Sequence, residues 1–314
     1  MARVTIRPLR QDDEREADRI FRLAFGTFLR LPDPLAFGGD AEYVRPRRRA
    51  SPESAFAAEV DGVLVGSNFA TRWGSVGFFG PLSVHPRHWD GGVAHALLAP
   101  VMECFARWGT TLTGLFTFAE SPKHVHLYEK FGFQARFLTT LTAKAPVAAA
   151  APGGWTTWSS VPPAERPAVR AAGAALTATL WLGLDVGAEI EAVDALGLGD
   201  TVLVREGGRL VGLALCHVGA GSEAGSGTCY LKFAAVAPGP GAAQRFERLL
   251  DACETFARER GLATVVAGVN TARREARRAL VRRGFRTVFQ GVAMHRDDVA
   301  GYSRPGIFAL DDWR

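Results

Sequence analysis

The sequence predicts an α+β protein made of two like domains, each a mixed, mainly antiparallel sheet flanked by helices. The main observation is an internal repeat with a constant offset of 152 residues. Val84-His85-Pro86 recurs as Val236-Ala237-Pro238, and Phe131-Gly132-Phe133 recurs as Arg283-Gly284-Phe285. A repeat of this length indicates two folded units of one architecture, not a solenoid of small repeats.

Length and composition agree with this prediction. A chain of 314 residues is typical of about two domains, and 47% hydrophobic residues suffice for two cores. The net charge of +5 permits anionic partners without requiring nucleic acid. Neither a secretory signal nor an apolar run near the ~20 residues of a membrane span is found, so we expect a cytoplasmic protein. The cysteines lack metal-ligand spacing and are expected to be reduced and structural: Cys104, Cys216, Cys229 and Cys253.

Hydrophobic periodicity and turn residues predict the elements of the first unit. Asp61-Gly62 is a favoured two-residue hairpin turn, and the Pro-, Gly- and Arg-rich stretch 26–52 reads as a long loop. The predicted strands are 4–9, 55–60, 63–69, 75–84, 111–118 and 134–144, and the predicted helices are 12–25, 92–108 and 122–131.

An Ala-, Pro- and Gly-rich stretch, 146–154, predicts a linker between domains 1–145 and 155–314. The second domain follows the same course, with a Gly/Ser loop at 219–227. Its predicted helices are 163–179, 242–260 and 272–283, and its predicted strands are 201–205, 209–218, 230–236 and 263–269.

The most informative segment runs from Leu82 to Leu98, where a strand ends at Pro86 and a Gly-containing turn leads into a helix. A helix N-terminus has unpaired N–H groups and positive dipole character, so it attracts an anion. Small residues at Gly91, Gly92 and Ala94 allow close approach to the backbone. The plain alternative is a tight turn that only starts the helix.

This segment resembles the acyl-CoA-binding motif of the GNAT (Gcn5-related N-acetyltransferase) superfamily, Val-x-Pro-x-x-Arg/Gln-x-x-Gly-x-Gly/Ala. Val84, Pro86, Gly92 and Ala94 fit the spacing, whereas Trp89 departs from the Arg/Gln position. The resemblance implies that the turn holds the pyrophosphate of CoA and that the strand pairs with its pantetheine arm. The implied donor site comprises Leu82, Ser83, Val84, Trp89, Asp90, Gly91, Gly92, Val93, Ala94 and Ser121.

A second segment resembles the GNAT motif in which a helix presents a Tyr four residues before a Gly-Phe pair; here that residue is Tyr128. The resemblance implies that Tyr128 donates a proton to the leaving thiolate, and the alternative is an aromatic side chain packed on the sheet. Ser121 begins this helix and can cap it or contact CoA. A general base is not singled out among Glu59, His85, Asp90, Glu120 and His124.

The second copy is predicted to have lost this chemistry. The offset of 152 sets Gln244 against Gly92, Phe246 against Ala94 and Leu280 against Tyr128. Side chains at the turn would crowd a pyrophosphate, and leucine cannot donate a proton. We therefore expect the second domain to be a degenerate scaffold that walls the substrate cleft.

Other signals are weaker. Two histidine pairs in the first unit lack a third ligand, so no metal is expected. The strip Arg273–Arg286 reads as a solvated helix face, which makes nucleic acid an unlikely partner. The tail 311–314 either folds back onto the cleft or, the favoured reading, packs on the second unit.

Taken together, the resemblance implies acetyl transfer from acetyl-CoA to an amine of a small molecule, in a ternary complex, with the active site in the first domain. The alternative is a non-catalytic protein that senses CoA or another ligand. The acceptor is not identified, and a homodimer is left open.

Overall fold

The structure is a computed structural model that describes residues 4–147 and 153–314. We call these ranges the N-terminal half and the C-terminal half. Most of the predicted linker, residues 148–152, lies outside the described residues, as do residues 1–3. The division into domains 1–145 and 155–314 stays a prediction.

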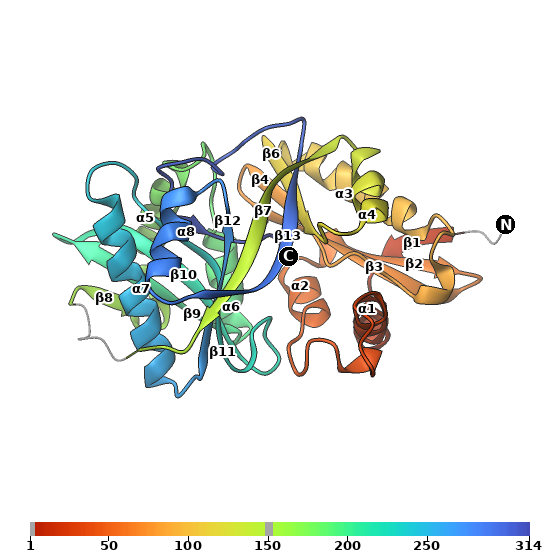
Figure 1. Ribbon diagram of the computed structural model, residues 1–314, viewed down its shortest axis with the longest axis horizontal. Coiled ribbons are helices and arrows are strands. Elements are labelled where there is room, and N and C mark those ends of the chain that lie inside the picture. Colours follow the sequence, from red (N-terminus) through yellow and green to blue (C-terminus); the bar gives the residue numbers. More distant parts are fainter. Residues whose placement is uncertain (1–3, 148–152) are drawn as a thin grey trace.

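Each half contains both strands and helices (Figure 1). The N-terminal half contains β1 (Val4–Pro8), α1 (Glu14–Phe28), α2 (Val44–Ala50), β2 (Ala55–Val60), β3 (Val63–Trp73), β4 (Val76–Phe79), β5 (Ser83–Val84), α3 (Val93–Trp108), β6 (Leu112–Thr117), α4 (Pro122–Glu129) and β7 (Phe133–Lys144). The C-terminal half contains β8 (Trp155–Thr157), α5 (Arg166–Ala178), α6 (Gly187–Ala195), β9 (Gly199–Glu206), β10 (Arg209–Gly219), β11 (Gly225–Val236), α7 (Ala242–Glu259), β12 (Thr264–Asn270), α8 (Arg274–Arg282), β13 (Arg286–Arg296) and β14 (Ala309–Leu310).

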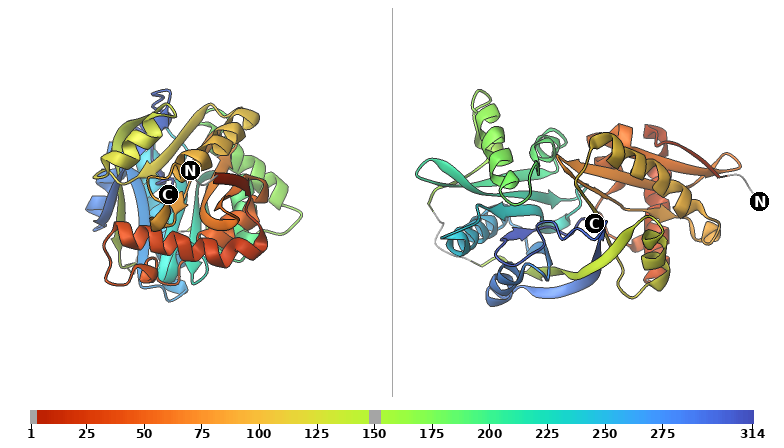
Figure 2. Two further views of the ribbon diagram at one scale, coloured as in Figure 1. Left: turned by 90° about the vertical axis from the view of Figure 1, so that its right-hand side faces the viewer. Right: turned by 90° about the horizontal axis from the view of Figure 1, so that it is seen from above.

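The described strands form one continuous sheet, in the order β1-β2-β3-β4-β6-β13-β7-β12-β11-β10-β9-β8. Most neighbours are antiparallel, but β4 with β6 and β11 with β12 are parallel. This mixed sheet with flanking helices confirms the predicted α+β class. The right-hand view in Figure 2 shows two lobes with the C-terminus between them.

The two halves exchange their last long strands. β13 pairs with β6, and β7 pairs with β12, so each strand extends the sheet of the opposite half. β7 and β13 also pair with each other and lie side by side at the centre of Figure 1. The sequence predicted 134–144 as a strand, but not its position between β13 and β12. A strand's partner depends on packing across the whole sheet, which local periodicity does not report.

Two local predictions were wrong. Residues 26–52 are not one long loop, because α1 continues to Phe28 and α2 forms over Val44–Ala50. The strip Arg273–Arg286 is only partly solvated: Arg274, Arg277 and Arg278 are exposed, but Arg273 is 1% exposed. Its guanidinium is buried because it pairs with Asp311 at 2.9 Å.

Candidate active site

A wedge opens in the sheet between β4 and β6. The two strands pair in parallel from Val76 with Leu112 to Phe78 with Gly114, and the pairing then stops. After β4 the chain turns through Gly80 and Pro81 into β5. Among the described strands, β5 pairs with β3 alone. The edge of β5 and the end of β6 therefore face each other across a gap.

The turn before α3 closes the top of this wedge. Gly92 caps the helix in the left-handed region, with φ of 77°, and Asp90 is also left-handed, with φ of 65°. The first hydrogen bond of the helix runs from the Ala96 N–H to the Gly92 carbonyl, at 3.0 Å. The preceding N–H groups, those of Val93, Ala94 and His95, are thus the ones that an α-helix leaves without an intrahelical partner. This geometry fits an anion.

Trp89 turns back onto β5. Its indole Nε1–H donates a hydrogen bond to the Val84 carbonyl at 2.8 Å, and the side chain is 38% exposed. The Arg/Gln position of the motif is therefore filled by an aromatic ring that forms part of the wedge wall and engages one carbonyl of the strand.

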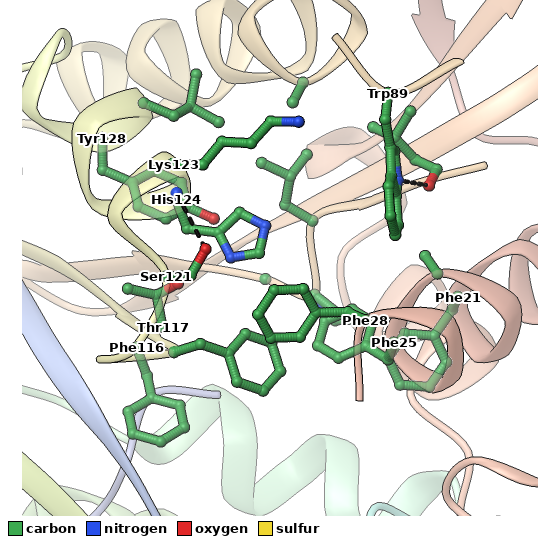
Figure 3. Close-up of a pocket in the computed structure, with 18 of the residues that line it drawn as sticks. Phe21, Phe25, Phe28, Trp89, Phe116, Thr117, Ser121, Lys123, His124 and Tyr128 are labelled. Atoms are coloured by element: carbon green, nitrogen blue, oxygen red, sulfur yellow. Dashed lines mark hydrogen bonds between the residues drawn. The ribbon is translucent and has the colours of Figure 1, made fainter. Parts of the chain in front are cut away.

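The wedge opens into a cavity of about 700 Å³ (Figure 3). Most of the predicted donor-site residues line it: Leu82, Val84, Trp89, Asp90, Gly92, Val93, Ala94 and Ser121, together with Tyr128. Ser83 and Gly91 do not. Ser83 is buried, with its Oγ 3.2 Å from Ser67 Oγ, and the Gly91 N–H bonds to the His88 carbonyl. Lys123 and Lys130 also line the cavity, and their positive charges favour a negatively charged ligand.

One face of α4 points into the cavity. Ser121, His124 and Tyr128 follow at helical spacing, which brings them onto one side of the helix, and Figure 3 shows them facing the same space. Ser121 Oγ accepts a hydrogen bond from the His124 N–H at 3.4 Å, which confirms that it caps the helix.

Tyr128 is protonated at neutral pH. The side chain is 7% exposed, and burial raises the pKa of its phenol to about 12, while a hydrogen bond with the Thr117 side chain acts in the opposite direction. Phe79 packs against the ring at 5.7 Å between centroids. Tyr128 is therefore both a packed aromatic residue and a phenol at the cavity wall, where it can donate a proton.

His124 differs from the other candidates for the general base in its pKa and in its hydrogen bonding. Its pKa is lowered, mainly by burial and also by the charge of Lys123, so the imidazole is neutral at pH 7. Its Nδ1 is buried and has no hydrogen-bond partner among the described residues. Asp90 pairs with Lys123 at 2.5 Å, and Glu59 with Arg7 at 2.6 Å.

The remaining two candidates face elsewhere. His85 Nδ1 accepts a hydrogen bond from the Arg87 N–H at 3.2 Å, and neither His85 nor Glu120 lines the cavity. His124 lies three residues after a capping serine and four before Tyr128. This spacing could have distinguished it from the other candidate bases by sequence alone.

In the C-terminal half the corresponding wedge is filled by the chain itself. β11 and β12 pair from Thr228 with Thr264 to Leu231 with Ala267 and then part, as β4 and β6 do 152 residues earlier. Here β14 enters the gap and pairs with β11 at Ala234 and Ala235. These residues match Leu82 and Ser83 at the same offset.

The prediction that Gln244 and Phe246 take the places of Gly92 and Ala94 at the second turn was wrong. α7 begins at Ala242, and its cap is Gly241, with φ of 79°, so Gly241 is the counterpart of Gly92. Gln244 and Phe246 lie inside the helix, which starts about one turn earlier than a constant offset allows. Phe246 is fully buried against Phe308, the residue before β14. Leu280 is also fully buried and presents no phenol.

The C-terminal segment, residues 307–314, reaches both halves. Asp311 pairs with Arg273, but Trp313 stacks on Phe78 of β4 at 6.1 Å, and Arg314 lines the cavity. The favoured prediction, a tail packed on the second unit alone, was therefore wrong. Phe289 of β13 also lines the cavity, so the C-terminal half supplies part of its wall.

Two further observations concern the described residues alone. No helix among them combines the length and apolar character needed to cross a membrane. Within the same residues, no three His, Cys, Asp or Glu side chains gather as a metal site requires.

Comparisons with known proteins agree with this geometry. Residues 18–133 match the Acetyltransferase (GNAT) family. No curated protein matches the sequence. A putative acetyltransferase from Pyrococcus horikoshii shares the fold with a TM-score of 0.69 at 14% identity, over 99% of this chain and 95% of the other.

Two more solved structures share the fold along almost the whole chain. A GCN5-related N-acetyltransferase from Sphaerobacter thermophilus gives a TM-score of 0.60 at 18% identity, over 97% of both chains. A tandem GNAT protein from the clavulanic acid biosynthesis pathway gives 0.56 at 15% identity, over 93% of this chain and 98% of the other. Over residues 18–133 the chain therefore matches the Acetyltransferase (GNAT) family, and along almost its whole length it has the fold of these tandem GNAT structures.

Proposed function

We propose that the N-terminal half transfers an acetyl group from acetyl-CoA to an amine of a small molecule, within a ternary complex. The observation that carries the proposal is the wedge between β5 and β6, which has helix N–H groups at one end and a protonated phenol in its wall. The family uses acetyl-CoA, and the wedge has helix N–H groups that suit its phosphates and opens into a mainly apolar cavity.

The donor would lie along β5 with its phosphates at the start of α3. The N–H groups of Val93 and Ala94 would bind the pyrophosphate, and Gly92 leaves the approach open because no atom lies within 4 Å of a Cβ built there. Leu82, Ser83 and Val84 would run beside the pantetheine arm, with Trp89 and Gly91 holding the turn. Asp90 and Lys123 tie that turn to α4. Ser121 would lie near the thioester.

Two side chains would move the protons. Acetyl-CoA supplies the acetyl group as a thioester, whose carbonyl carbon the amine nitrogen attacks and whose sulfur leaves. His124, neutral at pH 7, would accept the proton that the amine loses as the amide bond forms. Tyr128 would give its phenolic proton to the departing sulfur. The products are an amide and the free thiol of CoA.

The filled second wedge supports a single donor site in the N-terminal half. β14 takes the hydrogen-bonding edge of Ala234 and Ala235, which is the edge that β5 leaves facing the cavity in the first wedge. A pantetheine arm could enter the second wedge only if β14 left it. We therefore infer that the C-terminal half is a scaffold that contributes cavity wall.

The test is the Tyr128→Phe variant, which keeps the ring and removes the proton. We expect kcat to fall roughly 100-fold, as for the loss of a general acid, while the dissociation constant for acetyl-CoA changes less than about twofold. Release of CoA thiol measures the rate, and calorimetry measures binding. Unchanged kcat would remove Tyr128 from the mechanism.

The same assay separates catalysis from sensing. The engagement of the Val84 carbonyl by Trp89 is the observation that favours a sensing protein, because it occupies an atom beside the proposed pantetheine path. Acetyl-CoA binding without thiol release for any amine would favour a non-catalytic sensor over an enzyme.

A further inference from the structure

The side of the cavity away from the α3 turn is built from aromatic rings. We call Phe21, Phe25, Phe28, Phe37, Phe118 and Phe289 the aromatic wall; all six line the cavity. They come from α1, the segment after it, the end of β6 and the exchanged strand β13. Figure 3 shows Phe21, Phe25 and Phe28 grouped below the catalytic side chains.

These rings touch in an unbroken series. Ring centroids lie 4.9 Å apart for Phe21 and Phe25, 5.8 Å for Phe25 and Phe118, and 4.4 Å for Phe118 and Phe28. The series ends on the imidazole of His124, 5.0 Å from Phe28. The wall therefore leads directly to the proposed base.

The rings are not an ordinary core. Phe21 is buried, but the other five are only partly buried, because their remaining surface faces the cavity. A contiguous apolar surface left open inside a concave site marks a place where a ligand completes the packing. Flat rings offer such a ligand stacked and edge-on contacts.

The charges around the cavity disfavour an acceptor with several cationic groups. Among the described residues that line it, Asp90 is the only one with a carboxylate side chain, and it lies at the α3 turn, paired with Lys123. A polyamine would leave its further ammonium groups without carboxylate partners along the wall, which is costly in a desolvated site. An amine that carries an apolar ring needs one polar partner only, beside the reacting nitrogen, and His124 is in that position.

We propose that the acceptor is an amine bearing an aromatic ring, which packs on the aromatic wall with its nitrogen toward His124. This inference rests on the proposed function of the same cavity and adds the class of its substrate.

The test compares two primary amines of similar basicity, benzylamine and ethanolamine, with the full chain and acetyl-CoA. We expect kcat/KM, measured by thiol release, to be at least about tenfold higher for benzylamine, since burial of one ring is worth that factor. Equal values for the two amines would overturn the proposal.

Variants of the wall locate the preference. Phe25→Ala and Phe28→Ala should each raise KM for benzylamine at least about fivefold and leave the dissociation constant of acetyl-CoA unchanged. The matched control is Phe137→Ala on β7, which removes an exposed phenylalanine outside the cavity and should change neither. If Phe25→Ala weakened acetyl-CoA binding and not the amine's KM, the wall would belong to the donor and the proposal would fail.

Direct binding distinguishes this failure from failure of the proposed function. Calorimetry measures benzylamine binding to the protein saturated with CoA. Binding that Phe25→Ala weakens, without acetylation of either amine, would support the ligand class and refute the acetyl transfer. Acetylation of both amines without preference would refute the ligand class and support the transfer. Neither binding nor acetylation would overturn both.

Discussion

At the scale of single residues, one face of α4 holds three groups whose protonation or hydrogen bonding is fixed by burial. Ser121 caps the helix, His124 is kept neutral, and Tyr128 is kept protonated, each because its surroundings disfavour the alternative form. Both shifts widen the pH range in which an imidazole base and a phenol acid coexist. The cap fixes the direction of the helix that carries them.

This arrangement predicts the pH dependence of kcat, which reports groups in the enzyme–substrate complex. The lowered pKa of His124 places the acid limb below pH 6.5, where protonation of the imidazole removes the base. The phenol of Tyr128, with its pKa of about 12, adds no basic limb below pH 9. The pH profile of His124→Gln should lose the acid limb, whereas that of Tyr128→Phe should keep it. An identical acid limb in His124→Gln and the unmodified protein would exclude His124.

At the scale of elements, the two halves share a helix-start geometry but not its use. Gly92 and Gly241 both cap their helices in the left-handed region, with φ of 77° and 79°. Only the first turn faces an open wedge, because β14 fills the second. A left-handed cap at the helix start is thus found both beside an open wedge and beside a filled one.

The pair Gly92→Val and Gly241→Val tests the cap and the wedge separately. Each should cost about 1–2 kcal/mol of unfolding free energy, because valine disfavours the left-handed region. Only Gly92→Val should weaken acetyl-CoA binding, by tenfold or more. Urea unfolding and calorimetry measure the two effects. Weaker binding in Gly241→Val alone would move the donor site to the C-terminal half.

Arg47 of α2 links the two halves through a buried ion pair with Glu223. Arg47 Nε lies 2.8 Å from Glu223, both side chains are at most 4% exposed, and Lys232 reaches the same carboxylate at 2.9 Å. The Arg47 guanidinium also donates to the Gly80 and Arg314 carbonyls. Helix α2, which lies in the Arg-rich stretch that was predicted as a long loop, is therefore held by a partner in the other half.

Removal of this guanidinium should be costly. We expect Arg47→Ala to lower the unfolding free energy by about 3–5 kcal/mol, since it leaves a buried carboxylate with one partner fewer. The double variant Arg47→Met/Glu223→Gln should recover part of the loss, because neither residue then carries a charge. Chemical denaturation checks both values, and a loss below about 1 kcal/mol would contradict a buried clamp.

At the scale of the whole molecule, two buried histidines make stability depend on pH. Burial lowers the pKa of both His217 and His295 from 6.5 to about 4. Between these pH values the unfolded chain binds protons that the folded chain does not, so stability is complete above pH 6.5 and falls as the pH drops toward 4.

The expected loss is about 3 kcal/mol for each histidine over that window. Urea unfolding at pH 7.5, 6 and 5 measures it, and His217→Gln/His295→Gln should flatten the decline. The exposed His126, replaced by Gln, serves as the control and should leave the decline as it is. A decline of the same size in the double variant would assign it to groups other than these two histidines.

The sequence was most informative where structure is local. The helix that begins after Gly92 and the Ser121 cap follow from residue types at short spacing and lie where the patterns predict. The predicted strand 75–84 is divided into β4 and β5, because the chain turns at Gly80 and Pro81. The offset of 152 residues holds for the parallel pairs β4 with β6 and β11 with β12, but a constant offset could not reveal that α7 begins a turn early. Burial of Arg47 and Arg273, the exchange of β7 and β13, and the β14 insertion all depend on partners far along the chain.

The exchange of strands has a consequence for biosynthesis. β13 must lie between β6 and β7, yet Arg286 is made long after Lys144. While the ribosome translates the C-terminal half, the finished N-terminal half therefore waits with unpaired strand edges and a cavity that lacks Phe289. Such edges invite pairing with other chains. We expect a chain truncated before residue 286 to be poorly soluble, and nascent full-length chains to depend on protection until their last strands arrive.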